Sequence, residues 1–286
     1  MSRALIIGGG IGGLCAAIAL RQAGIDVTVF ERVTEMHEGG AGLTLWTNAV
    51  RALQRLGLTD ALRAIGTPCT RATIYSWQGT ILSETPIDEL LKKFKVASIG
   101  VHRADLQAVL LSMLGEGVVQ PGTQCTGFTQ NEKGVCAYFA DGKEAWGDVL
   151  IGADGIHSVI RSQLFGQVKP RYAGYTAWRS VTSFQVEKEG EEFETWGRGK
   201  RFGFVPLNQG RVYWFATRNM PQGRGDGAMG RKGEVLDLFR GWHEPIEALI
   251  KATEGSAILR NDIYDRKPLH HWGEGRITLW ATQPTQ

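Results

Sequence analysis

The chain has 286 residues, of which 43% are hydrophobic and 21% charged, enough to bury the core of one large domain or two modest ones. Its formal net charge of +3 comes from scattered Lys and Arg side chains rather than from a basic block, so nucleic-acid binding is not indicated. No apolar run approaches the length that crosses a bilayer, and residues 1–7 lead straight into the fold. We therefore expect a cytoplasmic protein without an integral membrane segment.

The first thirty-two residues carry the strongest local pattern. Arg3 to Ile7 is a short apolar run, a glycine-rich turn from Gly8 to Gly13 follows, and a helical apolar pattern then continues until Gly24. In a dinucleotide site, Gly8 allows the tight turn, Gly10 lets the backbone approach a pyrophosphate, and Gly13 lets helix and strand pack closely. The phosphates then face the N–H groups of the helix start, which include those of Ile11 and Gly12.

A second strand is predicted from Val27 to Phe30, and Glu31 ends it 18 positions after Gly13. A carboxylate at this distance accepts the ribose hydroxyls and favours an adenosine with a free 2′-hydroxyl. Because Arg32 stands beside Glu31, an adenosine with a phosphorylated ribose is not excluded. The alternative is a glycine-rich turn that binds nothing, but the motif has its strand, its helix and its acid in place.

In the rest of the chain, apolar periodicity and turn residues predict further helices and strands. The glycine-rich segment 33–45 is expected to be a loop that leads onto a helix at 49–56. Further helices are expected at 104–114, 234–242 and 245–253, and a short basic amphipathic piece at 90–95. The strands are expected as a hairpin at 74–83, at 118–119, 125–128, 135–139, 144–151 and 277–280, and as an aromatic-rich antiparallel sheet over 172–216.

No metal site is predicted. The cysteines have neither a CxxC spacing nor a nearby histidine, so they indicate neither disulfides nor zinc and are expected to be small buried hydrophobes: Cys15, Cys69, Cys125 and Cys136.

Residues 148–161 form a strand that runs into a helix through Asp154-Gly155. Together with the opening motif and Arg103, this segment resembles the DG motif of the FAD-dependent aromatic hydroxylase and epoxidase family, the single-component flavoprotein monooxygenases. Three further segments resemble that family: its flavin loop, its Arg-x-x-Leu helix start and the approach to its third flavin motif, at 40–58, 102–106 and 263–279. The urate hydroxylase and zeaxanthin epoxidase branches are the most similar.

The resemblance implies an α/β fold: a doubly wound parallel-sheet, Rossmann-like FAD-binding domain with an inserted mixed or antiparallel-sheet substrate domain. The expected FAD-binding segments are 1–73, 98–170 and 263–286, and the substrate segments are 74–97 and 171–262. The implied reaction is hydroxylation or epoxidation of a small aromatic, purine-like or isoprenoid substrate through a flavin hydroperoxide. FAD would be the cofactor, and NADH or NADPH and O₂ the co-substrates.

The resemblance also assigns residues. The opening glycines and Glu31 would hold the ADP half of FAD, Gly42 belongs to the flavin loop, Arg103 would contact the pyrophosphate or ribityl region, and Asp154 the flavin side. For Asp154 the alternative is a helix cap, and for Arg103 a plain surface arginine. Aromatic and basic residues are the candidates for the substrate lining: Trp46, Trp178, Arg179, Phe204 and Tyr213. Core packing is the alternative for each aromatic, and a surface salt bridge for Arg179.

The sequence departs from the family after Leu279. The family continues with Gly-Asp-Ala-Ala-His-Pro, whereas this chain has Trp280 and then Ala281 to Gln286. We therefore keep the alternative of a truncated, inactive relative that binds at most the ADP half of FAD, with poor flavin affinity. The seven residues from Trp280 to Gln286 can be encoded by codons that, once one base is restored ahead of them, read Leu-Gly-Asp-Ala-Ala-His-Pro. We therefore expect the gene to carry a one-base deletion near the codon of Leu279. An NAD-dependent dehydrogenase is less favoured, because a second strand–glycine–helix unit is missing.

Overall fold

The computed structural model describes residues 2–36, 41–85, 87–185 and 190–280, so the predictions for Gly40 and for Ala281 to Gln286 lie outside it. The chain divides into two compact units. The first comprises Met1–His37, Gln107–Arg171 and Tyr264–Gln286, and the second Glu38–Leu106 and Tyr172–Ile263.

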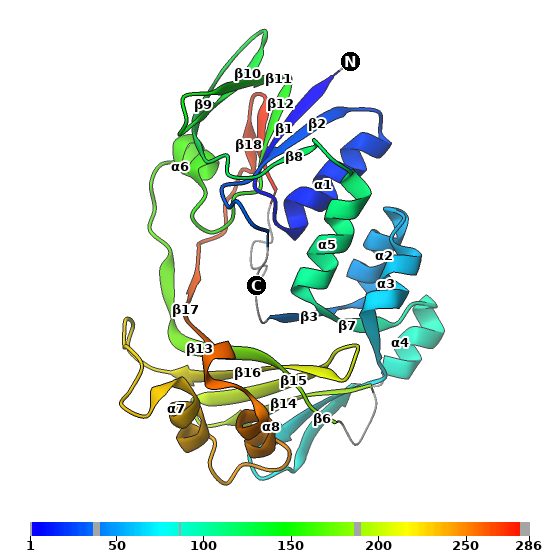
Figure 1. Ribbon diagram of the computed structural model, residues 1–286, viewed down its shortest axis with the longest axis vertical. Coiled ribbons are helices and arrows are strands. Elements are labelled where there is room, and N and C mark those ends of the chain that lie inside the picture. The colour runs from blue at the N-terminus through cyan, green and yellow to red at the C-terminus, as the bar shows by residue number, and fades with distance from the viewer. Residues whose placement is uncertain (1, 37–40, 86, 186–189, 281–286) are drawn as a thin grey trace. The chain divides into compact units, whose positions relative to one another are not determined.

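A six-stranded sheet forms the centre of the first unit (Figure 1). Its order is β18 (Gly273–Glu274), β19 (Ile277–Leu279), β12 (Val149–Gly152), β1 (Arg3–Ile7), β2 (Asp26–Phe30) and β8 (Val119–Gln120). All neighbours are parallel except β18 and β19. Residues Ala4 to Ile7 are at most 4% exposed, as expected for a parallel strand that is covered on both faces.

Three helices and a small sheet accompany these strands. The helices are α1 (Ile11–Gln22), the last part of α5 (Arg103–Leu114), which starts in the second unit, and α6 (Val159–Phe165). The small sheet is antiparallel, in the order β11 (Glu144–Gly147), β10 (Gly134–Phe139) and β9 (Cys125–Asn131). A hydrophobic core joins the two sheets, with Leu5, Phe30, Val135 and Leu150 among its members.

A seven-stranded sheet forms the centre of the second unit. Its order is β17 (Leu259–Asp265), β13 (Arg171–Ser183), β16 (Arg211–Asn219), β15 (Lys200–Pro206), β14 (Glu191–Gly197), β5 (Arg71–Ser76) and β6 (Ile81–Thr85). Helices α7 (Gly230–Leu238) and α8 (Ile246–Ala252) lie on one face of this sheet (Figure 1). The 3₁₀ turn η1 (Gly255–Ala257) follows α8.

The remaining elements of the second unit are a small antiparallel sheet and three helices. The sheet has the order β3 (Gly42–Leu45), β7 (Ser98–His102) and β4 (Gly66–Cys69). The helices are α2 (Thr47–Arg55), α3 (Thr59–Ile65) and α4 (Ile87–Phe94).

The two faces of the seven-stranded sheet differ because side chains alternate along each strand. Trp178, Phe202 and Trp214 point to the face with α7 and α8, where they are fully buried in one aromatic core. We call this the helix face. Arg179 and Tyr213 occupy alternate positions and belong to the opposite face, which we call the arginine face.

The predicted fold class is confirmed, and so is the hairpin at 74–83, which β5 and β6 form. The predicted strand 144–151 is wrong as one element: it breaks between β11 and β12. The chain bends at Asp148, whose carboxylate accepts a hydrogen bond from the Arg3 amide at 2.7 Å. The backbone at Gly147 also lies close to Arg3, since a Cβ there would be 3.0 Å from the Arg3 carbonyl oxygen.

The predicted antiparallel sheet over 172–216 is confirmed in the pairing of β13, β16, β15 and β14, and β14 continues this sheet by pairing in parallel with β5, which lies outside that range. The segment 33–45, predicted as a loop, contains β3, which pairs with β7. The predicted domain boundaries also differ from the two units, since 38–73 and 98–106 lie in the second unit. Pairing among β3, β4 and β7 links these segments, and such long-range pairing leaves no local signal in the sequence.

Candidate functional site

The glycine turn after β1 has the geometry that its spacing predicts. Gly8 adopts φ +111°, and a Cβ on it would lie 2.3 Å from the carbonyl oxygen of Ala153. A Cβ on Gly13 would lie 2.0 Å from the Gly8 carbonyl oxygen, so α1 packs directly on the strand end. A Cβ on Gly10 would meet nothing within 4 Å. The surface at Gly10 is therefore open to a ligand, whereas Gly8 and Gly13 serve packing.

Helix α1 begins at this open surface. Gly10 is its N-cap residue and contributes no side chain, and the first intrahelical bond runs from the Leu14 amide to the Gly10 carbonyl oxygen at 3.0 Å. The amides of Ile11 and Gly12 precede that bond, and the first turn carries no acidic side chain. Such a helix start favours a negatively charged group such as a phosphate.

Glu31 lies beside the same turn. One carboxylate oxygen accepts a hydrogen bond from the Gly9 amide at 2.6 Å, and the other accepts from the Val33 amide at 3.0 Å. These two bonds hold the carboxylate at the end of β2, where it could accept hydrogen bonds from the hydroxyls of a ribose. The neighbouring Arg32 is exposed.

Gln107 is a further residue at the turn, and the sequence analysis missed it. Its side chain is 4% exposed, and its Nε2 donates to the Gly9 carbonyl oxygen at 3.1 Å. Its Oε1 is buried and has no hydrogen-bond partner among the described residues. The available signal was helical periodicity, because Gln107 stands one turn after Arg103 on α5.

Asp154 both caps a helix and retains a free acceptor. Its Oδ2 accepts hydrogen bonds from the amides of Val159 at 2.7 Å and Ile160 at 3.3 Å, at the start of α6. Its Oδ1 is buried without a partner in the described part of the chain. Ser158 caps the same helix by accepting from the Arg161 amide at 2.9 Å. The capping alternative thus accounts for one oxygen of Asp154 only.

These residues fit FAD. The first unit offers an open backbone surface at a helix start, a carboxylate fixed at the end of β2, and two buried acceptors without partners, on Gln107 and Asp154. Buried acceptors are costly when unpaired, so a ligand that donates hydrogen bonds to them would stabilise this arrangement.

The arginine face of the second unit gathers positive charge. Arg103 and Arg179 lie close enough that burial and the Arg179 charge together lower the pKa of Arg103. Arg179 donates to Oδ1 of Asn261 at 2.7 Å. Burial raises the pKa of the Tyr213 phenol, and the positive charge of Arg179 opposes that rise.

Gly42 and Glu192 also belong to this side of the second unit. A Cβ on Gly42 would lie 2.4 Å from the Cβ of Tyr213, so β3 packs directly on β16. Glu192 is 7% exposed and accepts hydrogen bonds from the Thr44 hydroxyl at 2.8 Å and the Cys69 thiol at 3.5 Å. Burial raises the pKa of the Glu192 carboxyl group.

The five residues predicted to line a substrate site do not come together. Trp178 is fully buried and Phe204 is 2% exposed, and both belong to the aromatic core of the helix face. Arg179 and Tyr213 lie on the arginine face, and Trp46 is 46% exposed at the start of α2. Because side chains alternate along β13, Trp178 and Arg179 point to opposite faces of the sheet. Trp178 therefore packs in the core of the helix face.

Two other features of the described residues concern metals and membranes. Their His, Cys, Asp and Glu side chains form no group of three or more that could hold a metal ion. Each helix within 2–36, 41–85, 87–185 and 190–280 is too short or too polar to cross a membrane.

Comparison with known proteins adds three findings. The family described as FAD binding domain matches residues 1–256. Aurachin C monooxygenase/isomerase of Stigmatella aurantiaca is 41% identical over 276 residues, covering 96% of this chain and 72% of the relative. FAD-dependent urate hydroxylase of Klebsiella pneumoniae subsp. pneumoniae is 34% identical over 281 residues, covering 97% of this chain and 73% of the relative.

A solved structure agrees with these relatives. The crystal structure of Klebsiella pneumoniae HpxO complexed with FAD and uric acid matches with a TM-score of 0.92 and 32% identity, covering 99% of this chain and 74% of that one.

Proposed function

This chain belongs to the FAD-binding domain family of FAD-dependent monooxygenases, and from that membership we propose that it hydroxylates or epoxidises a small organic substrate with NADH or NADPH and O₂. The substrate classes that we propose are small aromatic, purine-like and isoprenoid compounds. We place the reaction in the cytoplasm.

We assign the ADP half of FAD to the first unit. The amides of Ile11 and Gly12 would bind the pyrophosphate over the open surface at Gly10, and the Glu31 carboxylate would accept the ribose hydroxyls. Gln107 Oε1 and Asp154 Oδ1 would accept hydrogen bonds from hydroxyl groups of the cofactor. Their burial without partners among the described residues supports this assignment. When bound, FAD supplies the redox chemistry that activates O₂.

Among the proposed substrates we favour a planar aromatic ring with an enolate or phenolate oxygen. The observation that carries this choice is the Arg179 guanidinium, which Asn261 holds on the arginine face close to the Tyr213 phenol. Burial raises the pKa of Tyr213, so its hydroxyl stays protonated at neutral pH and can donate to the same oxygen. In this arrangement Arg179 and Tyr213 would orient the substrate.

The test is steady-state oxidation of NADH and NADPH, with O₂ uptake, by FAD-loaded protein over a substrate panel. The panel should include purine diones and trione, hydroxyquinolines, phenolates and a neutral isoprenoid. We expect the anionic rings to stimulate oxidation, and Arg179→Gln to raise their KM by about tenfold while flavin content is unchanged. Arg63→Gln, at an exposed side chain, is the matched control. Faster turnover of the isoprenoid than of every anionic ring would contradict the choice.

The inactive alternative makes a different prediction in the same experiment. It expects protein that loses FAD during gel filtration and that oxidises neither nicotinamide cofactor above the rate of free flavin. Stoichiometric flavin with substrate-stimulated oxidation would exclude it.

A further inference from the structure

Gly12 is a glycine that the turn after β1 does not require. Close packing and the open surface fall to Gly8, Gly13 and Gly10, and the position before the last motif glycine accepts other residues. A glycine inside a helix is destabilising relative to alanine, so a local contact is expected here. A Cβ on Gly12 would lie 3.6 Å from both Cδ1 and Nε1 of Trp280. A methyl group would therefore touch the indole, and a longer side chain would displace it.

Trp280 is held beside Gly12 by two hydrogen bonds. Its backbone amide donates to the Gly152 carbonyl oxygen at 2.8 Å, and its Nε1 donates to the Gly12 carbonyl oxygen at 3.0 Å. The residue is nevertheless 52% exposed. The indole is thus fixed through its polar edge, while much of its surface is open to a further contact.

The indole does not use the groups that a pyrophosphate needs. It bonds to the carbonyl oxygen of Gly12, whereas the pyrophosphate is assigned to the amides of Ile11 and Gly12. The amides and the carbonyl groups of a helix point in opposite directions along its axis. Trp280 therefore flanks the start of α1 and leaves its amides available.

Trp280 also lies at the edge of the six-stranded sheet where the other cofactor residues gather. It follows β19 directly, as Gly8 follows β1 and Glu31 follows β2. Strands β19, β12, β1 and β2 are parallel, so their carboxyl ends meet at one edge, which is where such sheets bind ligands (Figure 1).

The strand order assigns Trp280 to one half of the cofactor. The sheet runs β19, β12, β1 and β2, so Trp280 and Glu31 stand on opposite sides of the Gly8 turn. Glu31 is assigned to the adenosine ribose, and Asp154, which comes after β12, lies on the side of Trp280. A cofactor with its pyrophosphate at the start of α1 would therefore extend its flavin half toward Trp280.

We propose that Trp280 is a cofactor-binding residue whose indole packs against the flavin half of FAD. This role rests on the FAD assignment made above and adds a residue to it. Stacking of two flat rings removes apolar surface of both from water. An indole in contact with a flavin also quenches its fluorescence, because it passes an electron to the excited ring and takes it back. Affinity and fluorescence therefore both report the contact.

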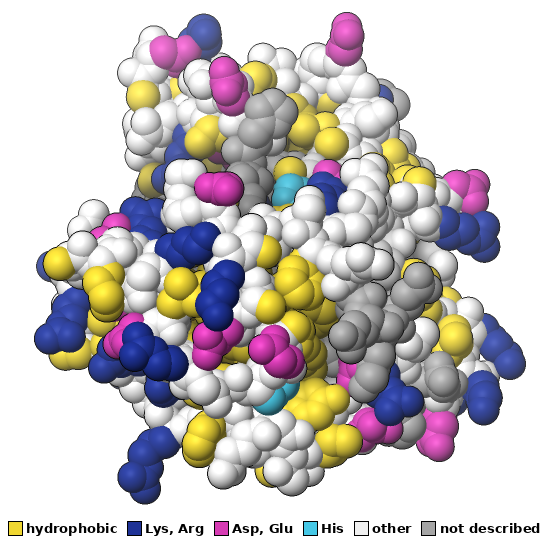
Figure 2. Space-filling view, turned by 60° about the horizontal axis from the view of Figure 1, so that its bottom comes forward, with side chains coloured by type: hydrophobic (Ala, Val, Ile, Leu, Met, Phe, Trp, Pro, Cys, Tyr) yellow, Lys and Arg dark blue, Asp and Glu magenta, His cyan; other side chains and the backbone are white. Residues whose placement is uncertain are grey.

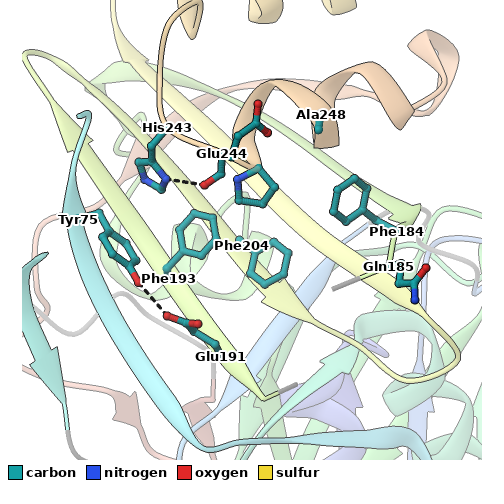
Figure 3. A pocket seen from close by; sticks show the side chains of 10 residues that line it. Tyr75, Phe184, Gln185, Glu191, Phe193, Phe204, His243, Glu244 and Ala248 are labelled. Atoms are coloured by element: carbon teal, nitrogen blue, oxygen red, sulfur yellow. Dashed lines mark hydrogen bonds between the residues drawn. The ribbon is translucent and has the colours of Figure 1, made fainter. Parts of the chain in front are cut away.

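Flat rings could also bind in the second unit, so the two places must be separated. A cavity of about 530 Å³ opens on the helix face, with Tyr75, Phe193, Phe204 and Ala248 among its lining residues (Figure 3). Phe193 and Phe204 stack on each other at 4.9 Å, and the Tyr75 hydroxyl donates to Glu191 at 2.8 Å. On the face of the molecule that Figure 2 brings forward, Lys and Arg side chains are interspersed with Asp and Glu, so charge there would not direct an anionic cofactor to one place.

The test is calorimetric titration of the cofactor-free full chain with FAD and with ADP, together with the fluorescence of the bound flavin. Trp280→Ala should weaken FAD by about tenfold, leave ADP within about twofold and raise the fluorescence of bound FAD. Trp280→Phe keeps a ring that is a poor electron donor, so it should raise the fluorescence while FAD affinity falls by no more than about threefold. Thermal melts check that both variants are folded.

Two controls locate the flavin. Trp146→Ala removes a tryptophan that is 51% exposed on β11, the strand that leads to the amino end of β12, and it should change the affinity for neither ligand. Ala248→Phe fills the cavity of the helix face and should also leave FAD unchanged. A loss of FAD affinity in Ala248→Phe would place the flavin in the second unit and refute the proposal.

The remaining outcomes separate this role from the FAD assignment. Unchanged FAD affinity and fluorescence in Trp280→Ala would overturn the proposal, and so would equal losses of FAD and ADP, which would mean that Trp280 only supports the start of α1. FAD that binds the unmodified chain no more tightly than ADP would refute the flavin contact and leave the adenosine assignment intact. Binding of neither ligand would refute the FAD assignment itself, and this role with it.

Discussion

The surfaces of the two large sheets differ in the atoms that form them. In the six-stranded sheet the ligand-facing surface is mostly backbone: Gly8 and Gly13 allow close packing, and Gly10 leaves the start of α1 open. In the seven-stranded sheet the surfaces are made by side chains, with aromatic rings on the helix face and arginines on the other. A backbone site depends on the absence of side chains, and a side-chain site depends on which face each residue meets. Four predictions test this contrast.

The largest expected effect is loss of the aromatic core of the seven-stranded sheet. Phe202 is fully buried and stacks on Trp214 at 5.6 Å, so Phe202→Ala should lower the free energy of unfolding by about 3–5 kcal/mol. The matched control is Phe94→Ala, at a ring that is 38% exposed, with an expected change below about 1 kcal/mol. Urea denaturation measures both. Similar losses for the two variants would show that burial does not set the cost.

The next effect separates two glycines of one turn. Gly13→Ala places a methyl group against the Gly8 carbonyl oxygen and should cost about 3 kcal/mol, because the backbone on both sides must move. Gly10→Ala points into open space, so the melting temperature should stay unchanged while FAD affinity falls by about tenfold or more. Thermal melts and flavin titrations distinguish the two. Normal FAD affinity in Gly10→Ala would contradict the assignment of that surface to the cofactor.

A smaller effect is expected at the carboxylate beside the turn. Glu31→Ala should weaken FAD by about thirtyfold, or about 2 kcal/mol, since it removes a charged acceptor for the ribose hydroxyls. Glu35→Ala, at an exposed acid four residues later, should leave the affinity within about twofold. Fluorescence titration of flavin into cofactor-free protein measures both affinities. Equal effects would mean that the negative charge acts at long range and that Glu31 contacts no ribose.

The smallest effect concerns pH. Burial raises the pKa of Glu192 above the ordinary value of 4.5, so the folded chain keeps this proton at pH values where the unfolded chain has released it. Its contribution to stability is therefore complete below about pH 4.5 and is lost as the pH rises through the folded-state pKa. Glu192→Gln should remove that loss, so urea midpoints of wild type should fall relative to the variant between pH 4.5 and 8. A difference that does not change with pH would argue that Glu192 is not protonated in the fold.

The fold and the cofactor half of the site were largely predictable because their signals are local. A strand, a glycine turn, a helix and an acid follow one another within thirty-two residues, and the φ of Gly8 and the packing at Gly13 agree with the roles that their spacing predicts. The comparisons confirm the family that these motifs resemble.

Other features depended on tertiary structure. The sequence shows that Trp178 and Arg179 alternate, and period 2 assigns them to opposite faces, but only the packing of α7 and α8 decides which face is buried. Gln107 has an ordinary place in a helical pattern until its amide reaches Gly9. Tyr75, Glu191 and His243 line one cavity although at least 52 residues separate any two of them in the chain, and contact at that distance leaves no periodic trace in any one segment.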